Sequence, residues 1–165
     1  MRNLLEMIYE YQLLRSKEEH LDIRLDEGER VRAMGLERLL QGETIDKSTR
    51  RRFPRIKLVM AVQFTLPGGF EAGELRDVSG GGLCIATSRP PEPGTRLIVR
   101  LESTREGYEY VFPCRVIWRT TSGARKMGVV IDGVPRRASL AAEDTTGVWR
   151  RSFRFGPARS EPLVA

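Results

Sequence analysis

Two short polar segments, about two dozen residues apart, carry residue types that can bind a nucleotide. Residues 50–55 read Arg-Arg-Arg-Phe-Pro-Arg, and residues 77–82 read Asp-Val-Ser-Gly-Gly-Gly. Guanidinium groups can hold phosphate oxygens, or the O6 and N7 atoms of guanine, through two parallel hydrogen bonds. In the second segment, Asp77 can accept hydrogen bonds from N1 and N2 of guanine, Ser79 adds a hydroxyl, and the glycines let a ligand approach the backbone closely. Together the segments predict a site for an anionic guanine ligand.

The order and separation of these segments resemble the signature of the PilZ family of bacterial cyclic di-GMP receptors, which is RxxxR followed by [D/N]xSxxG. The first half matches Arg51 and Arg55, and the second half matches Asp77, Ser79 and Gly82. The resemblance covers about residues 50–135. It implies a compact six-stranded antiparallel barrel that binds cyclic di-GMP.

Arg50 occupies a further position that is informative in this family. An arginine just before the first motif position often accompanies binding of a stacked ligand dimer, so the resemblance implies two cyclic di-GMP molecules per protomer. No other cofactor and no metal are expected. The candidate ligand-binding residues are Arg50, Arg51, Arg52, Arg55, Asp77, Ser79, Gly81 and Gly82.

The composition is that of a globular protein with anionic partners. The chain has 165 residues, 40% of them hydrophobic, which is enough for one domain and an appendage. Its formal net charge of +6 suits nucleotides, nucleic acids, lipid headgroups or acidic proteins, and charge alone does not distinguish them. No apolar run has the length of a membrane span, and the N-terminus lacks the features of a signal peptide. We therefore expect a cytoplasmic protein without a membrane span.

The residues that commonly perform catalysis give little support for an enzyme. Cys84 and Cys114 are too few for a disulfide framework or a zinc site, and both are expected to be buried thiols. The single histidine, His20, falls in a predicted break between helices and is expected at the surface. No nucleophile and base, and no set of metal ligands, stand out. The sequence thus predicts a binding protein without enzymatic activity.

The N-terminal residues 1–43 are predicted to form a hairpin of two helices. Apolar residues recur near helical spacing from Arg2 to about Lys17, and a second helix is predicted from Asp26, with Glu29 completing a capping box, to the residue before Gly42. Two helices alone cannot bury both of their apolar faces. The hairpin must therefore cover the barrel of its own chain, self-associate, or bind a partner protein, and self-association is slightly favoured.

The rest of the chain is predicted to be mainly β. Residues 44–55 form a linker and the arginine-rich loop, residues 56–135 form the barrel, and residues 136–165 form a basic, partly disordered tail. Short apolar runs separated by Gly and Pro predict the strands. These runs are residues 56–66, 70–78, 83–87, 95–101, 108–119 and 126–131. The fold class is a six-stranded antiparallel PilZ-type β-barrel with an N-terminal α-helical hairpin.

The segment after Pro135 departs from the family pattern. PilZ domains usually continue into an amphipathic helix, but residues 136–142 offer few apolar positions for one. Further on, residues 149–155 alternate aromatics with arginines. Such a segment could stack on bases, or could equally pack its aromatic rings on the barrel.

The predicted mechanism is a rearrangement without chemistry. Clustered like charges favour a mobile arginine-rich loop in the free protein, and ligand would order it and signal to a partner. One alternative is an adaptor of the PilZ type that binds no nucleotide. Another is a nucleic-acid-binding barrel, which is less favoured because acidic residues interrupt the basic strands: Glu71, Glu74, Glu102, Glu106 and Glu109. The motif residues could also be a solvated basic linker and an ordinary turn.

Overall fold

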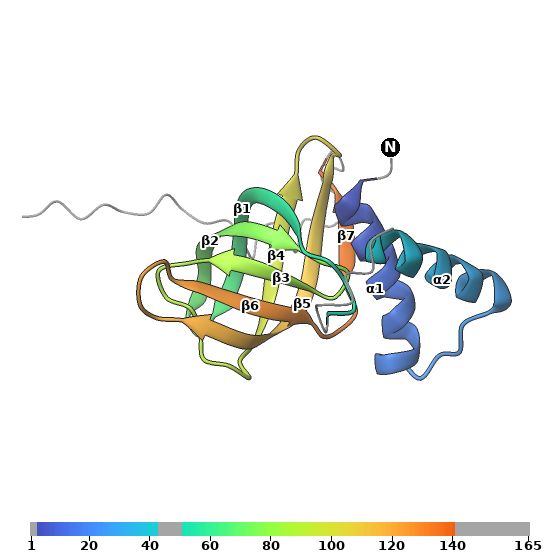
Figure 1. Ribbon diagram of the computed structural model, residues 1–165, viewed down its shortest axis with the longest axis horizontal. Coiled ribbons are helices and arrows are strands. Elements are labelled where there is room, and N and C mark those ends of the chain that lie inside the picture. The colour runs from blue at the N-terminus through green and yellow to red at the C-terminus, as the bar shows by residue number, and fades with distance from the viewer. Residues whose placement is uncertain (1–2, 43–50, 141–165) are drawn as a thin grey trace, which may run out of the picture.

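The computed structural model describes residues 3–42 and 51–140 of the chain. Six antiparallel strands form a closed barrel in the order β4-β1-β2-β3-β6-β5, and pairing of β4 with β5 closes it (Figure 1). This confirms the predicted fold class, and every predicted strand is present. The strands are β1 (Ile56–Leu66), β2 (Gly69–Val78), β3 (Gly82–Ala86), β4 (Arg96–Ser103), β5 (Tyr108–Thr120) and β6 (Lys126–Ile131).

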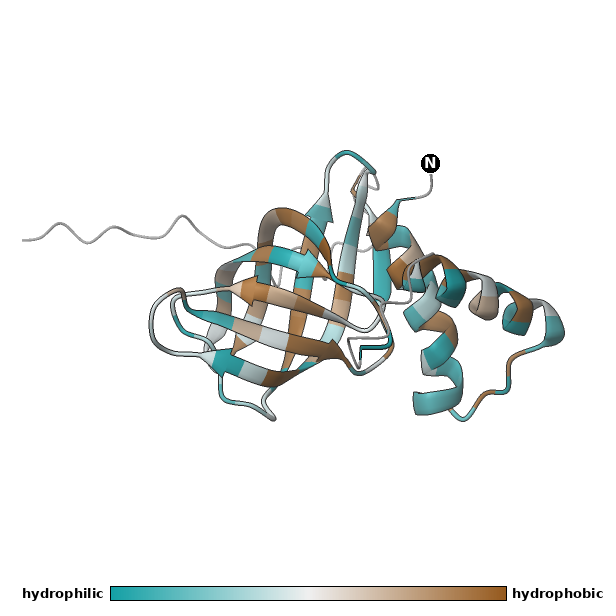
Figure 2. Cartoon of the chain, in the orientation of Figure 1, coloured by the Kyte–Doolittle hydropathy of each residue, from teal (hydrophilic) through white to brown (hydrophobic). Residues whose placement is uncertain are grey.

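The barrel forms because its strands alternate between apolar inward residues and outward residues. Along β4 the burial pattern alternates strictly, with Leu97, Val99 and Leu101 buried. Figure 2 shows the hydrophobic stretches along the strands and on both helices. Cys84 and Cys114 are both free thiols and buried, as predicted. The interior therefore excludes water and gives the outer surface a rigid support.

A seventh strand, β7 (Arg136–Ser139), lies where the sequence predicted the start of a tail. It pairs antiparallel with the first residues of β5, from Tyr108 to Val111. The sequence Arg-Arg-Ala-Ser has no apolar alternation and all four residues are exposed, so pairing with the β5 edge and the contacts of Arg137 with Glu6 and Tyr108 stabilise the strand. The basic aromatic segment 149–155, the linker 44–50 and Arg50 lie outside the described residues.

The two N-terminal helices are α1 (Leu4–His20) and α2 (Glu27–Gln41). The predicted capping box is present, since the Asp26 side chain accepts from the Glu29 backbone and the Glu29 side chain accepts from that of Asp26. Gly42 ends α2 with a φ of 70°. The prediction ended α1 three residues too early, because its last turn carries only polar residues that give no periodic signal. His20 is therefore the last residue of α1, exposed as predicted, and its Nε2 lies 3.6 Å from a carboxylate oxygen of Asp132.

Helix α1 packs against the barrel of its own chain, and α2 packs mainly against α1 at the same end (Figure 1). Leu5, Ile8 and Tyr11 of α1 are buried and belong to one apolar cluster with the barrel interior. The Tyr9 ring lies 5.9 Å from the ring of Tyr110 on β5. Of the three alternatives for the hairpin, α1 thus covers the barrel, while α2 retains an outer face with exposed apolar side chains.

None of the helices among the described residues is long and apolar enough to cross a membrane.

Candidate functional site

The pairing of β1 with β2 brings the two motifs together. Ile56, the first residue of β1, lies opposite Val78, and Lys57 lies opposite Asp77. The arginine-rich segment that enters β1 therefore runs beside the glycine-rich loop that leaves β2. Nε of Arg55 lies 3.9 Å from Oδ1 of Asp77, and both side chains remain partly exposed. This register explains why motifs so far apart in sequence can form one site.

The glycine-rich loop is held tightly against the barrel. The Ser79 hydroxyl oxygen accepts from the backbone N–H of Gly82 at 3.2 Å, and the Ser79 N–H donates to the Gly82 carbonyl at 2.9 Å. A Cβ atom on Gly82 would lie 2.3 Å from the carbonyl oxygen of Val129, so only glycine fits there. Ser79 thus has the local backbone bonds of an ordinary turn, and these bonds fix the loop in place beside the arginines.

A pocket of about 350 Å³ opens between the two motifs. Seven of the eight candidate residues line it; the eighth, Arg50, lies outside the described residues. Three guanidinium groups and one carboxylate face the space, so its charge favours an anion. The candidate residues on its wall are Arg51, Arg52, Arg55, Asp77, Ser79, Gly81 and Gly82.

Trp118 of β5 is a pocket residue that the sequence reasoning did not single out. From Tyr110 to Val116 every second residue of β5 is buried, and Ile117 continues this alternation outward with 49% exposure. A bulge between Val116 and Trp118 then breaks the alternation, so Trp118 is only partly buried and lies on the pocket wall. The indole lies flat on Gly128, where a Cβ atom would be 2.1 Å from Nε1 of Trp118. The Arg55 guanidinium carbon lies 6.0 Å from the ring centroid. In the sequence, the two consecutive large apolar residues Ile117 and Trp118 interrupt an otherwise alternating strand. This interruption was the available sign that Trp118 need not point into the barrel.

Cys84 lies on the pocket wall beside Asp77. Burial raises the pKa of the Cys84 thiol, and the negative charge of Asp77 raises this pKa further. The thiol is therefore protonated at neutral pH and is not a nucleophile. The pocket combines anion-binding groups with an aromatic face and a carboxylate acceptor, which are the parts needed to bind a nucleotide.

The PilZ domain family model matches residues 49–142, which is more than half of the 165-residue chain. The chain belongs to the PilZ domain family. PilZ domains are typically receptor or adaptor domains without enzymatic activity, and the family includes receptors for cyclic di-GMP. The family match leaves the two N-terminal helices outside it.

Solved PilZ-type structures are similar to this chain at low sequence identity. The PilZ domain of CeSA from a cellulose-synthesizing bacterium is 22% identical over 48% of this chain and 80% of its own, with a TM-score of 0.40. The Bacillus subtilis inhibitor of motility (MotI/DgrA) is 21% identical over 62% of this chain and 49% of its own, with a TM-score of 0.41. No curated protein shows a significant match to the chain.

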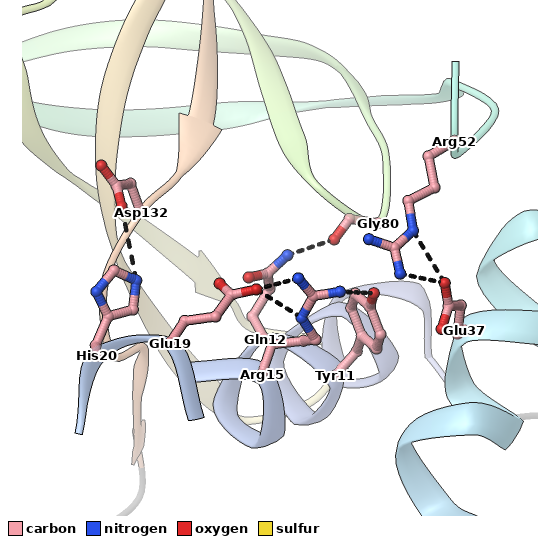
Figure 3. A network of polar contacts seen from close by, with 9 residues as sticks. All are labelled: Tyr11, Gln12, Arg15, Glu19, His20, Glu37, Arg52, Gly80 and Asp132. Carbon is pink, nitrogen blue, oxygen red and sulfur yellow. Dashed lines mark hydrogen bonds and ion pairs between the residues drawn. The ribbon is translucent and has the colours of Figure 1, made fainter. Parts of the chain in front are cut away.

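Both helices of the appended hairpin contact the PilZ motifs directly (Figure 3). Nε2 of Gln12 on α1 donates to the Gly80 carbonyl at 2.6 Å. On α2, Oε1 of Glu37 accepts from Nε of Arg52 at 2.9 Å. These contacts connect each half of the ligand signature to a different helix.

Phe53 adds an apolar contact between the same parts. Its ring is buried between the loop, where a Cβ atom on Gly80 would lie 2.6 Å away, and Tyr11 of α1, whose ring centroid is 5.5 Å distant. Phe53 is the aromatic residue of the arginine-rich segment. It contacts both α1 and the glycine-rich loop, so a shift of the segment would disturb the hairpin.

Within the described residues, no group of three or more His, Cys, Asp or Glu side chains could hold a metal ion.

Proposed function

We propose that this PilZ protein is a cyclic di-GMP receptor without enzymatic activity, and that it signals ligand binding through its N-terminal hairpin. The observation that carries this proposal is the convergence of both motif halves on one pocket of about 350 Å³. This volume falls in the range of about 300–1,000 Å³ usual for small-molecule sites. Its charge and its aromatic wall suit a dianionic ligand with two purine bases.

Each group on the wall has a role in this proposal. Arg51 and Arg55 bind phosphate oxygens or guanine edges, and Trp118 offers a face for base stacking. Asp77 is paired only loosely with Arg55, so its carboxylate keeps acceptor capacity for N1–H and N2–H of guanine. Adenine has no hydrogen at N1 and no amino group at C2, so adenine analogues bind poorly.

Signal transmission follows from the two competing partners of Arg52. Its guanidinium pairs with Glu37 of α2 and also lines the pocket. A ligand phosphate that recruits Arg52 must weaken this ion pair, and ordering of the arginine-rich loop by ligand acts on α1 through Phe53, whose ring contacts Tyr11. Ligand binding would therefore change how α2 is held, which a partner of the hairpin can detect.

Isothermal calorimetry with cyclic di-GMP tests the receptor proposal, with cyclic di-AMP as the specificity control. We expect binding of cyclic di-GMP alone, with a ratio of two if a stacked dimer binds. Arg51→Ala/Arg55→Ala should weaken binding about a hundredfold or more, since each charged hydrogen-bonding group contributes about 1.5–3 kcal/mol. The matched control is Arg24→Ala/Arg105→Ala, which removes the same charge at exposed positions away from the pocket.

Failure of cyclic di-GMP to bind would support the nucleotide-independent adaptor. Equal binding in both double variants would place the ligand elsewhere. A nucleic-acid-binding barrel is the third alternative, and it predicts affinity for oligonucleotides that falls steeply with salt. Several strand arginines are already paired with carboxylates, as Arg100 is with Glu102 and Glu109, which disfavours a continuous basic groove.

A further inference from the structure

One stripe of α2 faces away from both α1 and the barrel and has an unusual composition. It consists of Glu27, Val31, Met34 and Arg38, all exposed. Val31 and Met34 are 65% and 58% exposed, which is high for large apolar side chains at the centre of a helix. The spacing of four, three and four residues places the side chains on one line, as at the a and d positions of a coiled coil.

Among the described residues, the two charges at the ends of this stripe are in no ion pair, as is Arg30, whereas the other three charged side chains of α2 are paired. Glu29 pairs with Lys17, Arg32 with Glu10, and Glu37 with Arg52. The stripe thus has an apolar centre, an acid at its N-terminal end and a base at its C-terminal end.

We propose that this stripe is a self-association surface, on which α2 of a second copy packs antiparallel to the first. In this register, Val31 lies opposite Met34 of the second copy, and Glu27 lies opposite Arg38 of the second copy. The two-fold symmetry repeats each contact, so all four charges are paired and all four apolar side chains are covered. Parallel packing would instead place glutamate on glutamate and arginine on arginine.

Other exposed residues extend the same surface. Leu39 on α2 and Ile23 in the connection between the helices are 60% and 50% exposed. Next to Met34, a Cβ atom on Gly35 would meet nothing within 4 Å, so the backbone is open to close approach. A single helix pair is a small interface, so the association is reversible and depends on concentration.

This inference needs no nucleotide and identifies the partner that the proposed function leaves open. Sedimentation equilibrium of the ligand-free protein tests it. The wild-type chain should show a monomer–dimer equilibrium at micromolar concentrations. Glu27→Arg and Arg38→Glu should each weaken the dimer about tenfold, because each replaces two attractive contacts with two repulsive ones. The exposed variants Glu18→Arg and Arg105→Glu carry the same charge changes off the stripe and should dimerise like the wild type.

Restoration of the charge pattern makes the test specific. An equimolar mixture of Glu27→Arg and Arg38→Glu should form heterodimers, and the double variant Glu27→Arg/Arg38→Glu should recover the homodimer. The double variant places both charges unfavourably for the helix dipole, so recovery cannot come from a more stable helix. Met34→Gln, which adds no charge and so leaves the charge pairs intact, should also dissociate the dimer.

A wild-type chain that stays monomeric at all concentrations would overturn the proposal, as would a dimer indifferent to the charge reversals or a double variant that stays monomeric. None of these outcomes bears on calorimetric binding of cyclic di-GMP, so the two proposals can fail separately.

Discussion

Removing the carboxylate of Glu37 should raise the affinity of the protein for cyclic di-GMP. Glu37 holds Arg52 in an ion pair whose side chains are 27% and 51% exposed. A pair this exposed contributes about 0.2–1 kcal/mol. If ligand binding must break it, Glu37→Gln removes that cost, and the dissociation constant should fall by a factor of about 1.4 to 5.

Calorimetric titration of Glu37→Gln beside the wild type measures this change. Glu10→Gln is the matched control, because Glu10 of α1 pairs with Arg32 of α2 at 2.7 Å and so also holds α2, without touching either motif. The control should bind ligand as the wild type does. An unchanged or weaker affinity in Glu37→Gln would refute the reasoning, since Arg52 would then bind ligand without leaving α2, or would need Glu37 to position it.

Three further predictions follow from the pocket, the hairpin and the core. Gly128→Ala would place a Cβ atom 2.1 Å from Nε1 of Trp118 and so displace the indole. Loss of base stacking on the indole should weaken ligand binding by about 1–3 kcal/mol. Unchanged calorimetric affinity would exclude a stacking role for Trp118. Asp26→Ala removes the capping box of α2 and should lower the free energy of unfolding by about 1 kcal/mol in urea titrations; a loss below a few tenths would contradict the assigned cap. Burial raises the pKa values of Cys114 and Tyr110 in the folded state, so the unfolded state loses these protons first. Stability should be constant with respect to these groups below about pH 8.5. It should fall with rising pH from about pH 8.5 for Cys114 and from about pH 10 for Tyr110, by up to about 1.4 kcal/mol per pH unit for each group; stability that rises with pH there would be the contrary result.

The barrel was predictable from the sequence because its strands alternate clearly and are bounded by Gly and Pro. The meeting of the two motifs was predictable for a related reason: they lie at the ends of neighbouring antiparallel strands, so strand pairing alone brings Arg55 close to Asp77. Local patterns therefore determined both the fold class and the motif residues that face the pocket.

The features that sequence reasoning missed depend on tertiary contacts. Strand β7 has no apolar pattern, but Arg137 lies over the ring of Tyr108, with 4.6 Å between its guanidinium carbon and the ring centroid. Trp118 reaches the pocket because a bulge shifts the alternation of β5. The contacts of Gln12 and Glu37 with the motifs join residues of different elements, and no spacing in the sequence indicates them.

The measurement that tests the central claim most directly is the fluorescence of Trp118 during a cyclic di-GMP titration. The chain has two tryptophans, so Trp149→Phe leaves Trp118 as the only one, on the wall of the pocket. We predict a saturable change in its emission with cyclic di-GMP, absent with cyclic di-AMP and abolished by Arg51→Ala/Arg55→Ala. Emission that stays constant while calorimetry reports full binding would contradict the account, because the ligand would then bind outside this pocket.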